Sequence, residues 1–365
     1  MRRVGYVWGM ALTLTSLSQI PALGFDDIID VRAPSEFAED HVPGAINLPV
    51  LDDAERAQVG TIYKQDSPFR ARKVGAALVA ANAARHLQGV LADKPGGWRP
   101  LVYCWRGGQR SGSFASILAQ IGWRVELVAG GYKTYRGLVV EALYHQPFAG
   151  RLVVLDGNTG SAKTALLARL AQRGVQVLDL EGLAHHRGSL FGALAGGQPS
   201  QKAFESALAA ALIAYDPAQV LVVEAESSKV GNCRLPASLW KAMQTAPRLA
   251  ISAPVEARAA YLVRAYADLV TDPARLGRVI ARLKPAHAAE QIAAWQALSE
   301  TGAFQALAAD LMARHYDPRY AKHRARSAPP LEDFRAESLD EAGLDQLADR
   351  LAGRIARLQG ELTNG

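Results

Sequence analysis

A lone cysteine is followed by glycines and arginines in LVYCWRGGQRSGS, residues 101–113. Cys104 ends an apolar run, and Arg106 and Arg110 stand on either side of two glycines behind it. Backbone N–H groups of such a turn, placed before a helix, form an anion-binding nest that lowers the pKa of a thiol towards neutrality. We predict that Cys104 is a thiolate that attacks an electrophile or carries a transferred atom. Arg106 and Arg110 would stabilise the anionic product.

The length of this loop favours one of two chemistries. Cleavage of phosphate esters needs a longer loop around a large tetrahedral anion, whereas transfer of sulfur or selenium suits a shorter one. Here the six residues from Cys104 to Gln109 precede Arg110, which is the shorter form. Because the chain has only two cysteines, a disulfide framework and a cysteine-based zinc site are both excluded.

A second anion-binding loop is predicted from GNTGSAKT, residues 157–164. It fits the pattern G-x-x-x-x-G-K-[ST] except that Ala162 replaces the second glycine, and it lies between an expected strand and an expected helix. The extra methyl group falls where the backbone needs a positive φ, so we expect phosphate binding in an altered loop and leave nucleotide hydrolysis open. The predicted phosphate-binding residues are Gly157, Gly160, Ser161, Lys163 and Thr164.

A carboxylate at the end of a neighbouring strand would complete the phosphate site. Asp179 follows VQVL and Glu224 follows VLVV, and Glu224 is the better positional match. Helix capping or pairing with an arginine would explain either residue equally well. Further candidates to face the phosphate loop, unless they only begin helices, are Arg187 and Ser189 in HHRGS and, later in the chain, Ser227, Ser228 and Lys229. No spacing of ligating residues predicts a resident metal, and a need for Mg²⁺ stays open.

Apolar runs and helical periodicities alternate along the chain, which predicts an α/β fold. In the first part we expect strands at 28–31, 101–104 and 125–131 and a helix at 111–122. In the second part we expect strands at 152–155, 175–180 and 220–226, helices at 201–215 and 255–283, and mostly helix from 285, with an amphipathic segment at 338–360. The predicted domains are 10–138 and 151–330, with a linker at 139–150 and a helical tail at 331–365.

The composition is that of a soluble globular protein with two or three domains: 365 residues, 49% of them hydrophobic and 21% charged. The net charge of +6 and the pI of about 9.3 are compatible with nucleic acid or phosphate ligands. No apolar run reaches the roughly 18 residues that a membrane span needs. The N-terminal MRRVGYVWGMALTLTSL loosely resembles a secretory signal but lacks a cleavage site. We therefore take Met10 as a candidate start and expect a cytoplasmic protein.

Several blocks resemble known families. IIDVRAPSEFAEDHVPGAINLPV (28–50) resembles the opening of a rhodanese domain, with Asp30 and Arg32 in its DVR element. YCWRGGQRSG, ERAQVGTIYKQ (55–65) and AGGYKTYR (129–136) are similar to the tRNA 2-selenouridine synthase family, in which a rhodanese domain is fused to a phosphate-loop domain. Further similar blocks are LDLEGLAHHRGSLFG (178–192), QPSQKAFES (198–206), EAESSKVG (224–231) and HYDPRY (315–320). The resemblance covers residues 25–320, and Ala162 is its clearest departure.

This resemblance implies a rhodanese-like domain followed by a P-loop NTPase-like parallel-sheet domain with a helical C-terminal region. It implies an enzyme that converts 5-substituted 2-thiouridine at the wobble position of tRNA to 2-selenouridine with selenophosphate as donor. The family also transfers a geranyl group from geranyl diphosphate to the sulfur. Cys104 matches the selenium-transferring cysteine of the family. The implied partners are the anticodon region of tRNA, small phosphorylated substrates and a selenophosphate-supplying enzyme, with no tightly bound cofactor and no membrane.

A basic stretch near the end of the resemblance, RHYDPRYAKHRARS (314–327), combines many cations with two tyrosines. Phosphate contacts together with stacking of bases on tyrosine would suit an anticodon loop, whose bases can be splayed out. A solvated basic surface is the alternative. The candidate tRNA-binding residues are Arg314, Tyr316, Arg319, Tyr320 and Lys322.

Two other functions fit parts of the pattern. A sulfurtransferase fused to a small-molecule kinase would turn over ATP without RNA, and Ala162 counts mildly against it. A non-catalytic regulator that binds tRNA or a nucleotide would tolerate a decayed loop, but YCWRGGQRSG is intact. Salt-dependent binding of tRNA distinguishes the RNA-modifying enzyme from the kinase.

Overall fold

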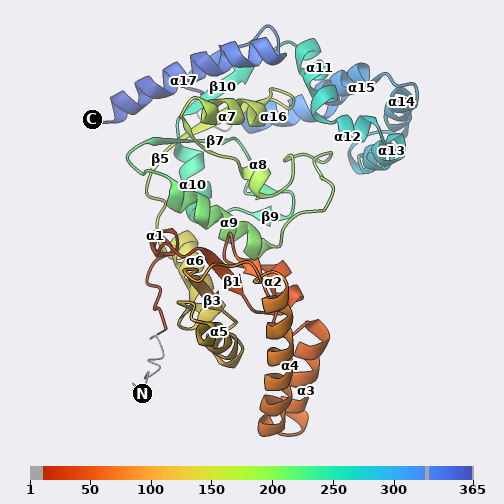
Figure 1. Cartoon of the computed structure of the whole chain (residues 1–365). Helices are drawn as coiled ribbons and strands as arrows, with labels where there is room; N and C mark the ends of the chain where they lie inside the picture. The colour runs from red at the N-terminus through yellow and green to blue at the C-terminus, as the bar shows by residue number, and fades with distance from the viewer. Residues whose placement is uncertain (1–10, 325–328, 364–365) are drawn as a thin grey trace, which may run out of the picture. The chain divides into compact units, whose positions relative to one another are not determined.

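The computed structural model describes residues 11–324 and 329–363, so Met10 and residues 325–327 of the basic stretch lie outside it. The chain forms two compact units, each built around a parallel sheet with helices (Figure 1). The first unit contains the residues up to Gln146 and the segment Pro199–Ala214. The second contains Pro147–Gln198 and the chain from Tyr215 onward. The predicted α/β fold is confirmed.

The first unit has a four-stranded parallel sheet at its centre. Its strands, in spatial order, are β2 (Ile46–Asn47), β1 (Asp27–Asp30), β3 (Pro100–Tyr103) and β4 (Glu126–Leu127). Ile29 and Val102 face each other across β1 and β3 and are fully buried, as is Phe114 of the helix that covers them. Because parallel strands end at one edge of the sheet, the loop after β3 carries Cys104 to the same edge as the loop after β1.

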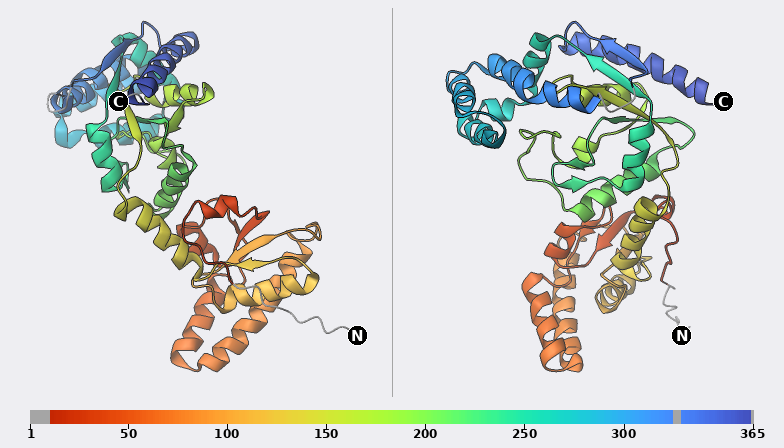
Figure 2. Two further views of the ribbon diagram at one scale, coloured as in Figure 1. Left: turned by 90° about the vertical axis from the view of Figure 1, so that its left-hand side faces the viewer. Right: turned by 180° about the vertical axis from the view of Figure 1, so that it is seen from behind.

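Helices surround this sheet. They are α1 (Gln19–Ala22), α2 (Pro34–Glu39), α3 (Asp53–Gln65), α4 (Pro68–Gln88), α5 (Gln109–Ile121), α6 (Gly131–Val140) with a π-helical turn (Glu141–His145), and α9 (Gln201–Ala214). The start of α3 is a reciprocal cap, because Asp52 accepts the N–H of Glu55 and Glu55 accepts the N–H of Asp52. α3 and α4 pack side by side as a long hairpin (Figures 1 and 2).

The boundaries of the first unit differ from the prediction at three places. The expected strand at 125–131 shrinks to β4, because Gly130 and Gly131 adopt left-handed conformations that begin α6. The expected linker at 139–150 is helical as far as His145, with Leu143 buried. The helix expected at 201–215 in the second domain is α9, which belongs to the first unit. There, Ser206 donates a hydrogen bond to Asp40 at 3.0 Å, a contact between residues 166 positions apart.

The second unit has a five-stranded parallel sheet. In spatial order the strands are β11 (Glu332–Arg335), β10 (Arg248–Ser252), β5 (Arg151–Gly157), β7 (Val220–Glu224) and β6 (Gln176–Leu178), and a small antiparallel pair, β8 (Lys229–Val230) and β9 (Cys233–Arg234), lies outside it. The three strands predicted for this part are confirmed as β5, β6 and β7. Val153 and Val222 on the two central strands are fully buried.

The helices of this unit are α7 (Lys163–Gln172), α8 (Leu180–Leu183), α10 (Ala237–Thr245), α11 (Val255–Ala265), α12 (Ala267–Val270), α13 (Pro273–Ala281), a 3₁₀ turn (Lys284–Ala286), α14 (Ala289–Glu300), α15 (Phe304–Leu311), a π-helical turn (Met312–Tyr316), α16 (Asp317–Arg324) and α17 (Glu341–Thr363). The single helix expected at 255–283 is therefore three helices. Tyr266 leaves helical geometry with φ −112° and ψ 32°, and Asp272 caps the helix that begins at Pro273. α11 to α16 gather beside the sheet (Figure 2).

The expected helical tail at 331–365 is part of the second unit's core. β11 adds an edge strand to β10, although Phe334 is its only buried residue, so the sequence LEDFR shows no strand pattern. α17 buries Leu344, Leu347 and Leu351 in the same apolar cluster as α7. In the described part of the chain, every helix is too short or too polar to span a lipid bilayer.

Candidate active site

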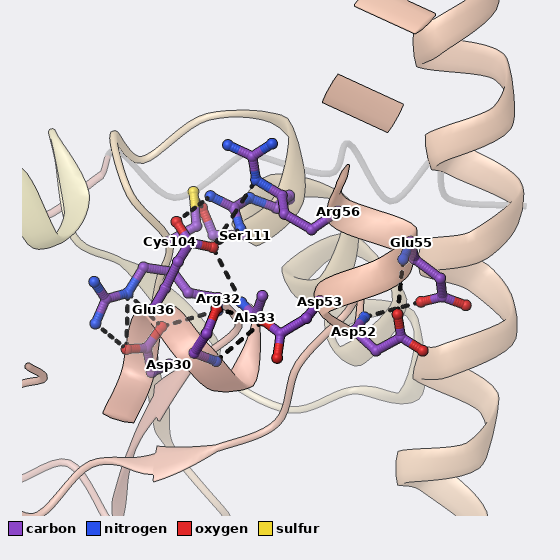
Figure 3. A network of polar contacts seen from close by, with 12 residues as sticks. Asp30, Arg32, Ala33, Glu36, Asp52, Asp53, Glu55, Arg56, Cys104 and Ser111 are labelled. Atoms are coloured by element: carbon purple, nitrogen blue, oxygen red, sulfur yellow. Dashed lines mark hydrogen bonds and ion pairs between the residues drawn. The ribbon is translucent and has the colours of Figure 1, made fainter. Parts of the chain in front are cut away.

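The thiol of Cys104 lies in the loop that leads from β3 into α5. Its Sγ is buried and accepts a hydrogen bond from the hydroxyl of Ser111 at 3.1 Å (Figure 3). It also accepts the N–H of Gly108 at 3.3 Å. Burial alone would raise the pKa of this thiol, but the hydroxyl of Ser111, the N–H groups of Ser111 and Gly108 and the charge of Arg110 lower the pKa below its ordinary value. Hydrogen-bond donors thus surround the thiol and favour its deprotonated form.

Close packing between the cysteine loop and the AGGYKTYR block depends on a glycine in each of them. Gly107 has φ +64°, and a Cβ there would lie 2.7 Å from the carbonyl oxygen of Val128. Gly131 has φ +59°, and a Cβ there would overlap the carbonyl oxygen of Cys104. That oxygen accepts the N–H of Tyr132 at 2.8 Å. The AGGYKTYR block thus packs against the cysteine loop, which is a structural reason for Gly107 and Gly131.

The two arginines of the loop lie in different environments. Arg110 makes an ion pair with Glu36 of α2 at 2.6 Å. Burial would raise the pKa of Glu36, but Arg110 lowers it. Arg106 is exposed and makes no hydrogen bond or ion pair with any described residue. Arg106 is therefore available to an incoming anion, whereas Arg110 acts on the thiol from a position fixed by Glu36, a residue that the sequence analysis did not identify.

Asp30 and Arg32 of the DVR element form a buried ion pair beside the cysteine loop. Arg32 donates to both carboxylate oxygens of Asp30, at 2.6–3.0 Å (Figure 3). It also donates to the carbonyl oxygen of Asp40 at 2.6 Å. Its guanidinium carbon lies 3.9 Å from the centroid of the Tyr132 ring. Both members of the ion pair are almost fully buried. Arg32 thus ties β1 to the block that packs against the cysteine loop, and it is a positioning residue.

The phosphate loop follows β5 and opens α7, as predicted. Ala162 has φ +62° and ψ 28°, which confirms that the alanine occupies a left-handed position where the pattern has glycine. Gly160, with φ +82°, packs against Leu262, so a Cβ there would meet that side chain at 3.0 Å. The ammonium of Lys163 folds back to the carbonyl oxygen of Gly157 at 3.2 Å.

A cavity of about 940 Å³ opens in front of this loop. Besides the loop it is lined by residues of α8, α11, α16 and the segments after α8 and β7, among them Glu181, Arg187, Ser189, Glu226, Tyr261 and Tyr320. Two polar atoms of its lining, Ser161 Oγ and Arg187 Nη1, are buried without a hydrogen-bond partner among the described residues. Because buried donors are normally satisfied, these two atoms can donate to acceptor groups of a ligand.

The predicted acidic partners lie outside this cavity. Asp179 caps α8 by accepting the N–H of Gly182 at 2.7 Å, and Glu224 is fully buried and accepts the N–H of Glu181 at 2.8 Å. The carboxylates that line the cavity are those of Glu181 and Glu226. Thr164 donates its hydroxyl to Glu181 at 2.6 Å.

The two lining carboxylates influence each other. Burial and the neighbouring charge of Glu181 raise the pKa of Glu226 to about 8, and burial also raises the pKa of Glu181. Both residues lie within the blocks 178–192 and 224–231, but no spacing in the sequence indicates that they meet.

The HYDPRY block supports the phosphate loop. Arg258 of α11 is buried and donates to the carbonyl oxygen of Thr159 at 2.7 and 2.9 Å. Asp317 of α16 binds the same guanidinium at 2.7 and 2.9 Å, and it accepts the side-chain N–H of Asn158 at 3.1 Å. Asp317, the acidic residue of the basic stretch, thus helps to hold the backbone of the phosphate loop in place.

The five candidate tRNA-binding residues are dispersed. Tyr316 points inward against an apolar cavity, which does not suit base stacking, and Tyr320 lines the phosphate cavity. Arg314 is exposed and pairs with Asp310 at 2.7 Å. Arg319 and Lys322 are exposed on α16.

Two stretches of the chain match known families. Residues 13–137 match the rhodanese-like domain, and residues 150–279 match the tRNA 2-selenouridine synthase AAA domain. A tRNA 2-selenouridine synthase from Bordetella petrii is 36% identical over 338 residues, which covers 82% of this chain and 87% of that protein. The chain belongs to the tRNA 2-selenouridine synthase family.

Two further members of the tRNA 2-selenouridine synthase family match over shorter stretches. The proteins from Hahella chejuensis and Aeromonas salmonicida are 42% and 41% identical over 253 and 254 residues, or 66% and 68% of this chain. The chain spans 63% and 67% of their lengths. The expected order of a rhodanese-like domain and then a P-loop domain is confirmed, with Cys104 in the first family match and residues 157–164 in the second.

Proposed function

We propose that this chain converts 5-substituted 2-thiouridine at the wobble position of tRNA to 2-selenouridine, with selenophosphate as donor and an S-geranyl intermediate. The observation that carries the proposal is the Cys104 loop, a buried thiol that accepts two hydrogen bonds and whose pKa is lowered. Membership of the family and the names of the relatives support tRNA as the substrate.

In the first step, the uridine sulfur attacks C1 of geranyl diphosphate. The new S–C1 bond forms, the C1–O bond breaks, and diphosphate leaves with the electron pair. Lys163, Ser161 and the N–H groups of the phosphate loop would bind this diphosphate, and the free Nη1 of Arg187 would take up part of its charge. The S-geranyl group is then a far better leaving group than a thiocarbonyl sulfur.

In the second step, selenium replaces the geranylthio group at C2 of the uridine. The thiolate of Cys104 attacks the phosphorus of selenophosphate: the S–P bond forms, the Se–P bond breaks, and hydrogen selenide leaves with the electron pair beside Arg106, Arg110 and the loop N–H groups. The selenide attacks C2, so that the C2–Se bond forms, the C2–S bond breaks and geranylthiolate leaves. Water then hydrolyses the S–P bond and releases phosphate, and Cys104 has delivered selenium with no change of oxidation state. A selenophosphate-supplying enzyme would be the natural donor partner.

Magnesium would fit the phosphate cavity. Mg²⁺ is commonly held by one or two carboxylates together with substrate phosphates. Glu181 and Glu226 line the cavity, Thr164 lies beside them, and burial of the two carboxylates together makes a cation there favourable. Exposed Arg319 and Lys322 on α16 remain the proposed contacts to tRNA phosphates.

The test is mass spectrometry of nucleosides from thiolated tRNA incubated with the protein and geranyl diphosphate, selenophosphate or both. We expect geranylated uridine with the first and selenouridine with both. Cys104→Ser should geranylate without selenating, and Cys233→Ser, which alters a buried thiol whose pKa burial raises, should keep both activities. Selenouridine from Cys104→Ser at the wild-type rate would refute the role of Cys104 in delivering selenium. Unmodified tRNA in every reaction, together with ATP hydrolysis, would favour the sulfurtransferase–kinase.

A further inference from the structure

An apolar cavity lies in the helical part of the second unit. It measures about 570 Å³, counting its open mouth. Its walls come from α11, α12, α13, α15 and the π-helical turn after α15, with Leu262, Leu269, Leu307, Ala308 and Leu311 among the lining residues. Nearly all of its exposed lining is apolar. Apolar surface in contact with water is unfavourable, so a ligand that covers this lining gains free energy.

The apolar cavity begins where the phosphate cavity ends. Thr159 of the phosphate loop, Ser189, Leu262 and Tyr266 line both cavities. At this junction the hydroxyls of Ser189 and Tyr266 are 3.1 Å apart and share a hydrogen bond. The guanidinium of Arg187 lies over the Tyr266 ring, 4.5 Å from its centroid. A polar cavity that contains Lys163 and Arg187 therefore continues directly into an apolar one.

The polar phosphate cavity and the adjoining apolar cavity together indicate the chemical class of the ligand. A nucleotide base carries polar edges that would be buried without partners against the apolar walls, which is unfavourable. A hydrocarbon chain has no polar atoms, and each methylene that it buries adds to affinity. A ligand with an anionic head and a branched apolar tail satisfies both cavities at once.

We propose that the apolar cavity holds the hydrocarbon chain of a prenyl diphosphate, with the diphosphate on the phosphate loop and the reacting C1 at the junction of the two cavities. The proposal rests on the proposed function, because it gives the geranyl donor its place in the same unit as residues 157–164. Ser189 and Tyr266 then border the C1–O bond that breaks, and Arg187 borders the departing diphosphate.

A tryptophan at position 308 tests the cavity. Ala308 on α15 lines it, so Ala308→Trp would fill the space that the chain needs, whereas Ala306 on the same helix is exposed and Ala306→Trp is the matched control. Calorimetric titration compares geranyl diphosphate with inorganic diphosphate. We expect Ala308→Trp to weaken binding of geranyl diphosphate by at least about tenfold, to judge from the discrimination that apolar pockets achieve. Binding of inorganic diphosphate should stay unchanged, and Ala306→Trp should bind both ligands as the wild type does.

A second test compares prenyl diphosphates of different chain length on the unaltered protein. It does not depend on whether a variant folds. Geranyl diphosphate should bind at least about tenfold more tightly than dimethylallyl diphosphate, since five more carbons are buried. Equal affinity for geranyl, dimethylallyl and inorganic diphosphate would overturn the proposal, as would unchanged binding of geranyl diphosphate to a folded Ala308→Trp protein. If chain length does control affinity and yet no geranylated uridine forms, the proposed function fails and the prenyl site stands.

Discussion

Removing the hydroxyl of Ser111 should make the thiol of Cys104 less reactive at neutral pH. Ser111 lies in the first turn of α5, its Oγ is 3.1 Å from Sγ, and its side chain is fully buried, so water cannot take its place. Burial raises the pKa of the thiol, and the hydrogen bond from Ser111 is the largest contribution that lowers it. Ser111→Ala removes that bond and leaves the rest of the nest.

The size of the effect follows from the charge on the acceptor. A hydrogen bond to a charged group contributes about 1.5–3 kcal/mol, which corresponds to about 12- to 140-fold less thiolate at neutral pH. A more basic thiolate is also a better nucleophile, with a Brønsted slope of about 0.4–0.5, so about half of the loss is regained on a logarithmic scale. The rate of alkylation should therefore fall about 3- to 12-fold.

The assay is alkylation by iodoacetamide across a range of pH, followed by mass spectrometry of the peptide that contains Cys104, so that Cys233 does not interfere. Ser113→Ala, two residues along α5 on its exposed side, is the matched control and should react as the wild type does. The pH of half-maximal rate should rise only in Ser111→Ala. Equal rates and equal pH profiles for Ser111→Ala and the wild type would refute the account of the nest.

Three further predictions concern the phosphate loop, the acidic pair and the close packing at Gly131. Lys163→Ala should weaken binding of inorganic diphosphate by about 10- to 100-fold in calorimetry, because a charge-assisted contact is lost, whereas exposed Lys241→Ala should have no effect. Burial and a neighbouring carboxylate raise the pKa of Glu226 to about 8, so the folded state binds the extra proton and stability should fall as pH rises from roughly 5 to 8. Glu226→Gln should flatten that part of the curve of melting temperature against pH, and an unaltered slope would contradict the assignment. Gly131→Ala should cost more than about 2 kcal/mol in denaturant unfolding because its Cβ meets backbone, whereas Gly137→Ala, with open space in the same helix, should be neutral or stabilising.

The two chemical loops were predictable because each is local in sequence. In the cysteine loop, Sγ meets the N–H of Gly108 and the hydroxyl of Ser111 within seven residues. In the phosphate loop, the left-handed conformation of Ala162 follows from its place in the eight-residue pattern. Strands with continuous apolar runs, such as β5 and β7, were predictable for the same reason, since burial on both faces leaves its mark on each strand separately.

The acidic partners were not predictable in the same way. Asp179 and Glu224 stand at strand ends, as the pattern requires, but the chain turns so that one caps a helix and the other is buried beneath it. Glu181 and Glu226 reach the cavity because α8 and the segment after β7 converge there. Glu36 was not predictable for the same reason, because it lies 74 positions from Arg110 in the chain and meets it only in the folded structure.

What the sequence by itself determined is the chemistry that each loop can carry and the α/β character of both units, because N–H nests, helix starts and buried strands depend on a few consecutive residues. Only the tertiary structure decided which carboxylates face the phosphate cavity, that α9 belongs to the first unit, that β11 completes the second sheet, and that an apolar cavity adjoins the phosphate loop. These features arise from contacts between distant segments. Their free energy depends on how whole elements pack, and that packing leaves no periodic trace in any single stretch of the chain.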